Sequence, residues 1–459
     1  MNLLFATAEY TPIVSTGGLG AASAGLVAAL RERGHEVTVC LPDYGHYGLQ
    51  DEHEIVLPVP DWVGEARVRS GTHPLGGRVD LIASPSLARP HPYVNPESHR
   101  GWDDNDHRFF AFSCAVASYA KILQPDLVHL NDWHTATALA HLEPHTPSVF
   151  SIHNLAHQGR ADIGWMLPLE HRHEFEFHGS VNAMAGAIRA ATRVVAVSPN
   201  YADEIRTDLA GLGLAAVLRE RGAALHGILN GIDTTEWNPQ TDPHIAAQFT
   251  ATSIKPKRIV RDALIDELGL VDDGPLFVVV SRLDHQKAIE VVLNIADIFE
   301  TLPATLAILG SGEVSIEDFA HHVSTQYPHR ISFRHGYDAA FAHRLFAAGD
   351  FTVIPSRFEP CGLTQMQAMR YGTVPVVTRV GGLADTVIDI DVSPEDGNGI
   401  VAGSCDEVAL TDAIHRAHRL WLSGGRYRRT QRRGMSRDWS WSEPAKHYEN
   451  LYQEAIEHR

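Results

Sequence analysis

The sequence predicts an α/β protein built from two doubly wound parallel sheets, each in a domain of its own. Short apolar runs, which are typical of buried strands, alternate with helical patterns in two separate blocks of the chain. A turn-rich segment without clear periodicity, residues 230–243, separates the two blocks, and we expect the hinge at about 240–255. The length of 459 residues agrees with two large domains, since one domain usually takes roughly 100–200 residues.

The first block opens with a strand, a loop, a helix and a second strand. The apolar run 2–8 predicts a buried strand, residues 21–34 show the spacing of an amphipathic helix, and residues 36–42 predict the next strand. Three later apolar runs of the same block predict further strands: 127–130, 148–153 and 194–198. This order of elements is that of a parallel sheet with helical crossovers.

The second block repeats the design. Four short apolar runs, each followed by loop residues, predict its strands: 276–281, 305–310, 351–356 and 374–378. Ligands of open parallel sheets bind beyond the carboxyl ends of the strands, so the residues that follow these runs are the first candidates for a functional site.

A glycine-rich loop, "VSTGGLGAAS" (14–23), follows the first predicted strand. Gly17, Gly18 and Gly20 allow the close approach of an anion to backbone N–H groups at a helix N-terminus, yet the loop itself carries no charge. Two other interpretations remain open at this point. The loop is a tight turn that binds nothing, or it is a near match to the G-x-G-x-x-G/A dinucleotide pattern, with Asp43 in the place of the ribose-binding acid.

Polar side chains follow the predicted strands in both blocks. Asp132 and His134 follow one strand of the first block, and His153 and Asn154 follow the next. A single histidine at a strand end is more often a packed, hydrogen-bonded residue than a catalytic one. Their common position at one sheet edge favours a functional role.

In the second block, Arg282 and Lys287 follow a predicted strand, and two cations at this spacing could share a diphosphate. They would supply the positive charge that the glycine-rich loop of the first block lacks. Glu359 comes shortly before three residues whose N–H groups open a predicted helix: Gly362, Leu363 and Thr364. A lone charged residue at a strand end is usually a solvated ion-pair partner. The grouping of these residues at one sheet edge indicates an anion site instead.

Composition limits the classes of function. A formal net charge of −18 argues against binding to nucleic acid or to an anionic membrane, and the chain has no apolar run long enough to span a membrane. Its four cysteines lie far apart, which favours the reducing cytoplasm over a disulfide framework or a zinc ribbon. His173 and His178 are five residues apart, unlike the HExxH pair, so we expect no metal.

Nine blocks of sequence carry a resemblance to a known family. They are, in order, "STGGLG", "WDDNDHRFFAFS" (102–113), "NDWHTATAL" (131–139), "SIHNLAHQG" (151–159), "VVAVSPNYADEI" (194–205), "GILNGIDTTEWNP" (227–239), "VVSRLDHQK" (279–287), "PSRFEPCGLTQ" (355–365) and "GTVPVVTRVGGLADTV" (372–387). In these blocks the chain resembles the bacterial glycogen synthase and starch synthase family over essentially its whole length.

The resemblance implies the GT-B fold, in which two Rossmann-like domains face a central cleft. We expect an acceptor-side domain at 1–245, a nucleotide-donor domain at 246–439, and a C-terminal helix, 440–459, that returns to the first domain. The implied activity is a retaining, metal-independent transfer of a sugar from a nucleoside diphosphate donor to a saccharide or sugar-like acceptor. No cofactor is implied beyond the nucleotide-sugar co-substrate.

The family also implies roles for individual residues. Arg282 and Lys287 would hold the donor diphosphate and stabilise it as it leaves, and Glu359 would bind hydroxyls of the transferred sugar. The remaining residues would surround the donor: Asp132, His153 and Asn230 near the transferred sugar, Tyr337 against the base, and the backbone of Gly17, Gly18, Gly362, Leu363 and Thr364 near the phosphates. No carboxylate nucleophile is evident, so we favour departure and attack on the same face through an ion-like transition state.

The first loop departs from the family pattern. Ser15 stands where the family usually has Lys, Ala21 where it has Asp, and Ala288 where it has Gly after the lysine of the second block. The loss of two charges predicts a donor other than ADP-glucose or an altered acceptor. The alternatives are a transferase or pseudo-glycosyltransferase of an aminocyclitol or oligosaccharide pathway, a non-catalytic glucan- or nucleotide-binding protein, and a dinucleotide-dependent oxidoreductase.

Overall fold

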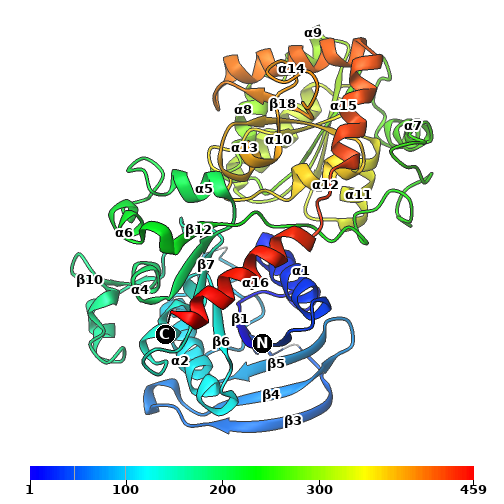
Figure 1. Ribbon diagram of the computed structural model, residues 1–459. Helices are drawn as coiled ribbons and strands as arrows, with labels where there is room; N and C mark the ends of the chain where they lie inside the picture. The colour runs from blue at the N-terminus through cyan, green and yellow to red at the C-terminus, as the bar shows by residue number, and fades with distance from the viewer. Residues whose placement is uncertain (46, 99, 459) are drawn as a thin grey trace. The chain divides into compact units, whose positions relative to one another are not determined.

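The computed structural model describes residues 1–45, 47–98 and 100–458 of the chain. The chain folds into two compact units (Figure 1). Unit 1 comprises Met1–Gly231 and Trp441–Arg459, and unit 2 comprises Ile232–Ser440. In the described part of the chain, no helix has the length and apolar character that crossing a membrane requires.

Unit 1 is built on a nine-stranded sheet with the strand order β12-β11-β7-β6-β1-β2-β5-β4-β3. The strands from β12 to β5 in this order are parallel, and β4 and β3 add an antiparallel hairpin at one edge. The strands are β1 (Asn2–Ala6), β2 (Glu36–Pro42), β3 (Gln50–Leu57), β4 (Ala66–His73), β5 (Gly77–Ala83), β6 (Leu127–Asn131), β7 (Ser148–Ile152), β11 (Arg193–Ala196) and β12 (Leu225–Gly227). A separate small sheet contains β8 (Arg160–Ala161), β10 (Ser180–Asn182) and β9 (Glu176–Phe177).

The C-terminal helix α16 (Ser442–Glu457) packs on this sheet beside α1 (Gly18–Glu32), as Figure 1 shows. Tyr448 and Tyr452 of α16 are buried in one core with Phe5 of β1. The other α-helices of unit 1 are α2 (Asn105–Leu123), α3 (Trp133–Ala136), α4 (Ala183–Ala190), α5 (Pro199–Glu204) and α6 (Ala215–Glu220). The last segment of the chain is therefore part of the unit formed by the first.

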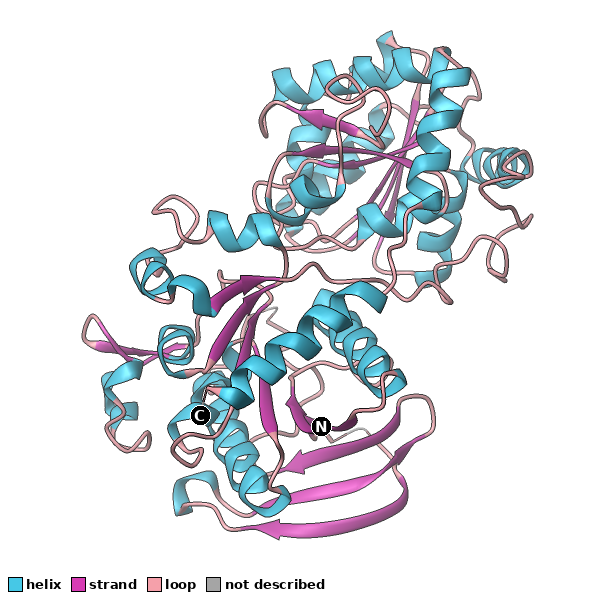
Figure 2. Ribbon diagram, in the orientation of Figure 1, coloured by secondary structure: helices cyan, strands magenta, loops and turns pink. Residues whose placement is uncertain are grey.

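Unit 2 contains a parallel sheet with the order β15-β14-β13-β16-β17-β18, and helices lie on both sides of its strands (Figure 2). If the six strands are numbered by their order along the chain, their order in the sheet is 3-2-1-4-5-6, as in dinucleotide-binding folds. Ligands of such folds bind where the strand order reverses, between the first and fourth strands. The strands are β13 (Leu276–Val280), β14 (Thr305–Gly310), β15 (Ile331–His335), β16 (Phe351–Ile354), β17 (Val374–Thr378) and β18 (Ile400–Ala402). The helices are α7 (Lys257–Leu268), α8 (Ile289–Asn294), α9 (Ile298–Thr301), α10 (Val314–Gln326), α11 (Ala339–Ala348), α12 (Thr364–Arg370), α13 (Gly381–Thr386), α14 (Glu407–Leu422) and α15 (Gly425–Ser436).

The structure confirms the predicted class of two parallel α/β sheets and corrects several boundaries. Helix α1 begins at Gly18 rather than at residue 21. Gly17, with an extended backbone, is the N-cap residue, and Leu19 in the first turn is buried. Several strands of the two main sheets were not expected from the sequence, namely β3, β4, β5, β12, β15 and β18, and neither was the small sheet β8-β10-β9. Two of these, β3 and β15, are edge strands with exposed polar residues, so they lack the continuous apolar run of a buried strand.

The chain passes from unit 1 to unit 2 after Gly231, earlier than the expected boundary at residue 245. The segment that follows packs in unit 2, where Trp237 stacks on His343 with ring centroids 4.0 Å apart. Asp242 is buried and accepts hydrogen bonds from His343 Nδ1 at 2.7 Å and from Tyr371 Oη at 2.5 Å. These long-range contacts hold the turn-rich segment on unit 2.

Candidate functional site

Asp132 occupies the turn between β6 and α3 in unit 1. Its backbone has φ 55° and ψ −179°, a conformation that few residues other than glycine adopt and that costs on the order of 1–3 kcal/mol. The carboxylate oxygen Oδ1 accepts the N–H of His153 at 2.8 Å and that of Asn154 at 3.3 Å. The structure thus brings together the residues that follow β6 and β7, as the sequence predicts for one sheet edge.

Burial raises the pKa of the Asp132 carboxyl to about 7, against an ordinary value near 4. The two backbone N–H groups lower this pKa, while the negative charge of Glu9 raises it further. At neutral pH the carboxyl therefore exchanges between its protonated and ionised forms. A group with this pKa is suited to donating a hydrogen bond to a hydroxyl or accepting one from it.

His153 is neutral at physiological pH, because burial lowers the pKa of its ring to about 4. Its Nε2 lies 2.9 Å from Oδ1 of Asn131, whose amide nitrogen donates to the carbonyl oxygen of Ala6 at 3.0 Å. Because an amide oxygen only accepts, Nε2 carries the ring proton in this network. Nδ1 of His153 is consequently an unprotonated acceptor.

The glycine-rich loop is held by Glu9, a buried residue that follows β1. Oε2 of Glu9 accepts the N–H groups of Thr16 at 2.6 Å and Gly17 at 3.1 Å. Oε1 accepts the hydroxyl of Thr16 at 2.8 Å and that of Tyr93 at 2.7 Å. Glu9 thus accepts four hydrogen bonds, which hold the loop and Tyr93 on one side chain.

This contact changes what the loop offers to a ligand. Since the N–H of Gly17 is donated to Glu9, the N–H groups that the first turn of α1 leaves without an intrahelical acceptor begin at Gly18. Ser15 is exposed, and its hydroxyl lies 3.4 Å from the carbonyl oxygen of Gly17. Sequence reasoning missed Glu9, although its place directly after the first strand is the same signal that selected Asp132.

In unit 2, Lys287 and Glu359 form an ion pair. Nζ of Lys287 lies 2.5 Å from Oε2 of Glu359, which also accepts the hydroxyl of Ser356 at 2.9 Å. Glu359 follows β16 and Lys287 lies in the loop after β13, so the first and fourth strands of the sheet bring them together. Both side chains are largely buried.

Asp284 joins the two predicted diphosphate-binding cations. Its Oδ2 pairs with the guanidinium of Arg282 at 2.8 Å, and its Oδ1 accepts the backbone N–H of Lys287 at 3.0 Å. The Arg282 side chain remains 52% exposed, so it is accessible to a ligand. Asp284 is a second residue that sequence reasoning missed, because its role depends on the fold of the loop.

Two glycines of α13 support the loop that carries Glu359. A Cβ at Gly381 would lie 1.9 Å from the carbonyl oxygen of Glu359, and one at Gly382 would lie 2.0 Å from that of Cys361. The N–H of Gly382 donates to the Glu359 carbonyl at 3.0 Å. These two positions must be glycine because backbone meets backbone there.

The remaining predicted residues lie in separate places. Asn230 of unit 1 is buried, and its Oδ1 has no hydrogen-bond partner among the described residues. Tyr337 follows β15 in unit 2 and is 78% exposed. Gly362 has a positive φ of 70°, and Leu363 caps α12, which begins at Thr364. The contacts of these residues with a donor stay a prediction.

The structure also bears on two weaker hypotheses. Asp43 forms an ion pair with Arg69 and accepts the N–H of Gly45 at 2.9 Å, so it is engaged within its own unit. Across residues 1–45, 47–98 and 100–458, no group of three or more His, Cys, Asp or Glu side chains is arranged to hold a metal ion.

Solved structures define the class of protein. The catalytic domain of starch synthase IV from Arabidopsis thaliana, bound to ADP and acarbose, superposes with a TM-score of 0.88 at 32% identity, over 99% of both chains. Sucrose-phosphate synthase from Thermosynechococcus elongatus shares the fold, with a TM-score of 0.65 at 18% identity and full coverage of both chains. With its two Rossmann-like sheets, the protein is a glycosyltransferase of the GT-B fold.

Sequence comparisons define the family. Residues 2–220 match the starch synthase catalytic domain, and residues 260–433 match the glycosyl transferases group 1 family. The chain is 39% identical to the glycogen synthase of Dechloromonas aromatica over 99% of both sequences, and 40% identical to that of Novosphingobium aromaticivorans over 98% of both. It belongs to the glycogen synthase and starch synthase family of retaining glycosyltransferases, which excludes the dinucleotide-dependent oxidoreductase.

Proposed function

We propose that the protein transfers glucose or a glucose-like unit from a nucleoside diphosphate donor to a hydroxyl of a saccharide or sugar-like acceptor. The Lys287–Glu359 pair, 2.5 Å apart, carries this proposal. It places a cation suited to phosphate and a carboxylate suited to sugar hydroxyls side by side beyond the first and fourth strands of a Rossmann-like sheet. Because the chain as a whole has a net charge of −18, a phosphate has to be bound by local cations such as Lys287.

Lys287 and Arg282 would bind the diphosphate and stabilise it as negative charge develops on departure. Glu359 would accept hydrogen bonds from the transferred unit, and Tyr337 would pack against the base. Asp132 and His153 of unit 1 would contact hydroxyls of the transferred unit through their buried acceptor and donor atoms. The related starch synthase domain was solved with ADP and acarbose bound, which supports a nucleoside diphosphate as part of the donor.

The chemistry breaks the bond between the anomeric carbon and the phosphate oxygen, and the electron pair leaves with the nucleoside diphosphate. The acceptor hydroxyl attacks the same face through an ion-like transition state, which preserves the anomeric configuration. Its proton passes to the departing phosphate oxygen. The cations of unit 2 stabilise the charge that this step generates.

A second candidate, a donor other than ADP-glucose, is favoured by the first loop. Ser15 provides no positive charge, and the carboxylate of Glu9 lies directly behind the loop on Thr16 and Gly17. The loop therefore contributes neither a cation nor these two N–H donors to a ligand. A transferase or pseudo-glycosyltransferase of an aminocyclitol or oligosaccharide pathway is compatible with such a loop.

A cytoplasmic location is part of the proposal. All four cysteines are free in the structure, and three of them are buried. This pattern is typical of proteins that stay in a reducing compartment.

Binding of ADP, UDP, GDP and dTDP, measured by calorimetry, tests the proposal. Replacing Arg282 or Lys287 by Ala should weaken the binding of the preferred diphosphate about ten- to a hundredfold, since a charge-assisted contact contributes about 1.5–3 kcal/mol. Arg428→Ala, at an exposed arginine of α15, is the matched control and should leave the affinity unchanged. Equal affinities for all three variants and the unmodified protein would contradict the assignment.

A further inference from the structure

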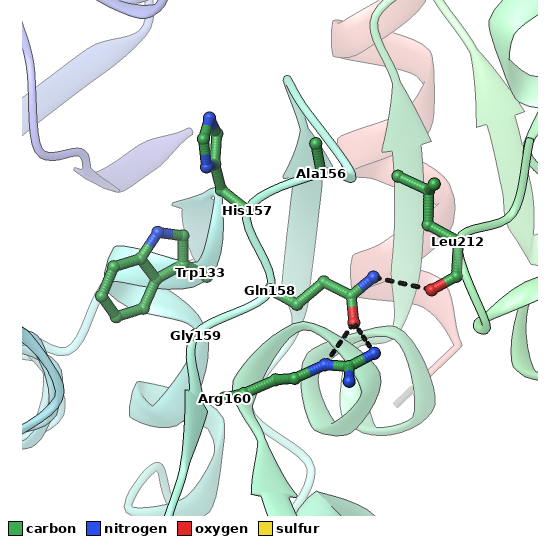
Figure 3. A pocket seen from close by; sticks show the side chains of 7 residues that line it. All are labelled: Trp133, Ala156, His157, Gln158, Gly159, Arg160 and Leu212. Carbon is green, nitrogen blue, oxygen red and sulfur yellow. Dashed lines mark hydrogen bonds between the residues drawn. The ribbon is translucent and has the colours of Figure 1, made fainter.

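Unit 1 contains a pocket next to Asp132 that the proposed chemistry does not use. Its volume is about 530 Å³, within the range of small-molecule sites. The lining residues are Trp133, Ala156, His157, Gln158, Gly159, Arg160 and Leu212 (Figure 3). Trp133 directly follows Asp132, and Ala156 comes three residues after His153, so the pocket adjoins the unit 1 part of the candidate site.

The guanidinium of Arg160 is fixed in this pocket by a neutral partner. Its Nε and Nη2 donate to Oε1 of Gln158 at 3.2 and 3.1 Å, as the dashed lines of Figure 3 show. Gln158 is buried, donates to the carbonyl oxygen of Leu212 at 3.0 Å, and accepts the amide of Asn182 at 2.8 Å. Among the residues that the structure describes, no carboxylate lies within ion-pair distance of Arg160.

Trp133 is equally fixed. A Cβ at Gly159 would lie 2.3 Å from Cε3 of the indole, so the ring packs directly on the glycine backbone. The Phe109 ring meets the indole edge-on with centroids 5.1 Å apart. The pocket therefore combines a rigid aromatic side chain with an arginine whose charge is not neutralised by a protein carboxylate.

This combination fits one class of ligand. An arginine held by a neutral amide keeps its positive charge and has N–H groups left for an oxyanion, whereas an ion-paired arginine does not. An indole offers an apolar face to a ring. We propose that the pocket receives an acceptor saccharide that carries a phosphate or carboxylate group, with Arg160 binding the anionic group and Trp133 contacting the sugar ring.

The inference rests on the proposed sugar transfer and names the class of its acceptor. Calorimetric titration of the full chain with glucose, glucose 6-phosphate, glucuronate and inorganic phosphate tests it without any donor. We expect glucose 6-phosphate or glucuronate to bind at least tenfold more tightly than glucose, and the stronger of the two identifies the anionic group. The preference should fall at high salt, because a charge-assisted contact is screened.

Arg160→Gln should remove this preference and leave the affinity for glucose unchanged, and Arg160→Lys should retain part of it. Arg78→Gln removes the same charge from an exposed position of β5 and should keep the full preference. A preference that survives in Arg160→Gln, or equal binding of glucose and both charged sugars, would overturn the inference. So would inorganic phosphate that binds as tightly as glucose 6-phosphate, since the site would then hold a free anion.

Kinetics separate this inference from the proposed function. Transfer from ADP-, UDP-, GDP- and dTDP-glucose is measured with neutral and charged acceptors. Transfer with equal kcat/KM for both kinds of acceptor would overturn the inference alone. If none of these donors supports transfer to any acceptor, the proposed function is wrong, while the binding comparison still decides which ligands the pocket takes.

Discussion

Nζ of Lys287 lies 2.5 Å from Oε2 of Glu359, so the cation proposed to hold the diphosphate is already bound to the carboxylate proposed to hold the sugar. Each residue sets the charge that the other presents to a ligand. A substitution of Glu359 therefore alters the site for the nucleotide even when Glu359 does not touch the nucleotide.

Glu359→Gln is expected to abolish transfer without weakening the binding of the nucleoside diphosphate. The amide still accepts from Ser356, but it no longer neutralises Lys287, so calorimetry should find the affinity unchanged or up to about tenfold higher. Transfer should fall by about a hundredfold or more, as on removal of a transition-state contact. Glu300→Gln, at an exposed position of α9, is the control; loss of nucleotide binding with an intact fold would contradict the assignment.

Asp132→Asn is expected to stabilise unit 1 at high pH. With a native pKa of about 7 and an unfolded value near 4, the carboxyl binds more protons in the folded state between these values, so its contribution to stability is lost as the pH rises toward 7. An Asn oxygen keeps both backbone hydrogen bonds without a charge. Thermal unfolding should show a gain of about 2–4 kcal/mol at pH 8 and less at pH 5; equal effects at both pH values would refute the raised pKa.

Ser15→Lys combined with Ala21→Asp tests whether the uncharged loop changed the donor. Both positions are exposed, so the larger side chains fit without repacking. A positive charge near the Glu9 carboxylate should raise ADP affinity roughly fivefold, or about 1 kcal/mol. The combined substitution leaves the net charge unchanged, so Thr72→Lys, at an exposed position of β4, serves as the control for the added lysine alone. If the unmodified protein already elongates maltooligosaccharides from ADP-glucose at an ordinary enzymatic rate, about 1–1000 per second, the altered donor is disproved.

Tyr452→Phe is expected to destabilise unit 1 without touching the chemistry. The Tyr452 hydroxyl and Nδ1 of His129 form a hydrogen bond of 2.7 Å, and burial keeps this histidine neutral by lowering its pKa to about 3. Without the hydroxyl, a buried ring nitrogen is unsatisfied, at a cost of about 1–3 kcal/mol. Thermal unfolding should shift downward while kcat at low temperature stays unchanged. An unshifted melting curve would show that α16 does not depend on this bond.

The sequence alone determined the two parallel sheets and the strand-end residues. Apolar runs and the carboxyl-edge rule are local signals, so they located β6, β7, β13 and β16 together with Asp132, His153, Lys287 and Glu359. The structure also explains one departure from the family pattern, at Ala288. Its positive φ of 53° explains why the family has glycine at this position.

Only the tertiary structure decided how these residues act on one another. Glu9 binds the glycine loop, Asp284 joins Arg282 to Lys287, and Gln158 fixes Arg160 through side-chain contacts that no local pattern encodes. The protonation of Asp132 likewise depends on burial by segments distant in sequence. Hydrophobic periodicity specifies which face of an element is buried, whereas hydrogen-bond partners and desolvation arise only when separate elements pack together.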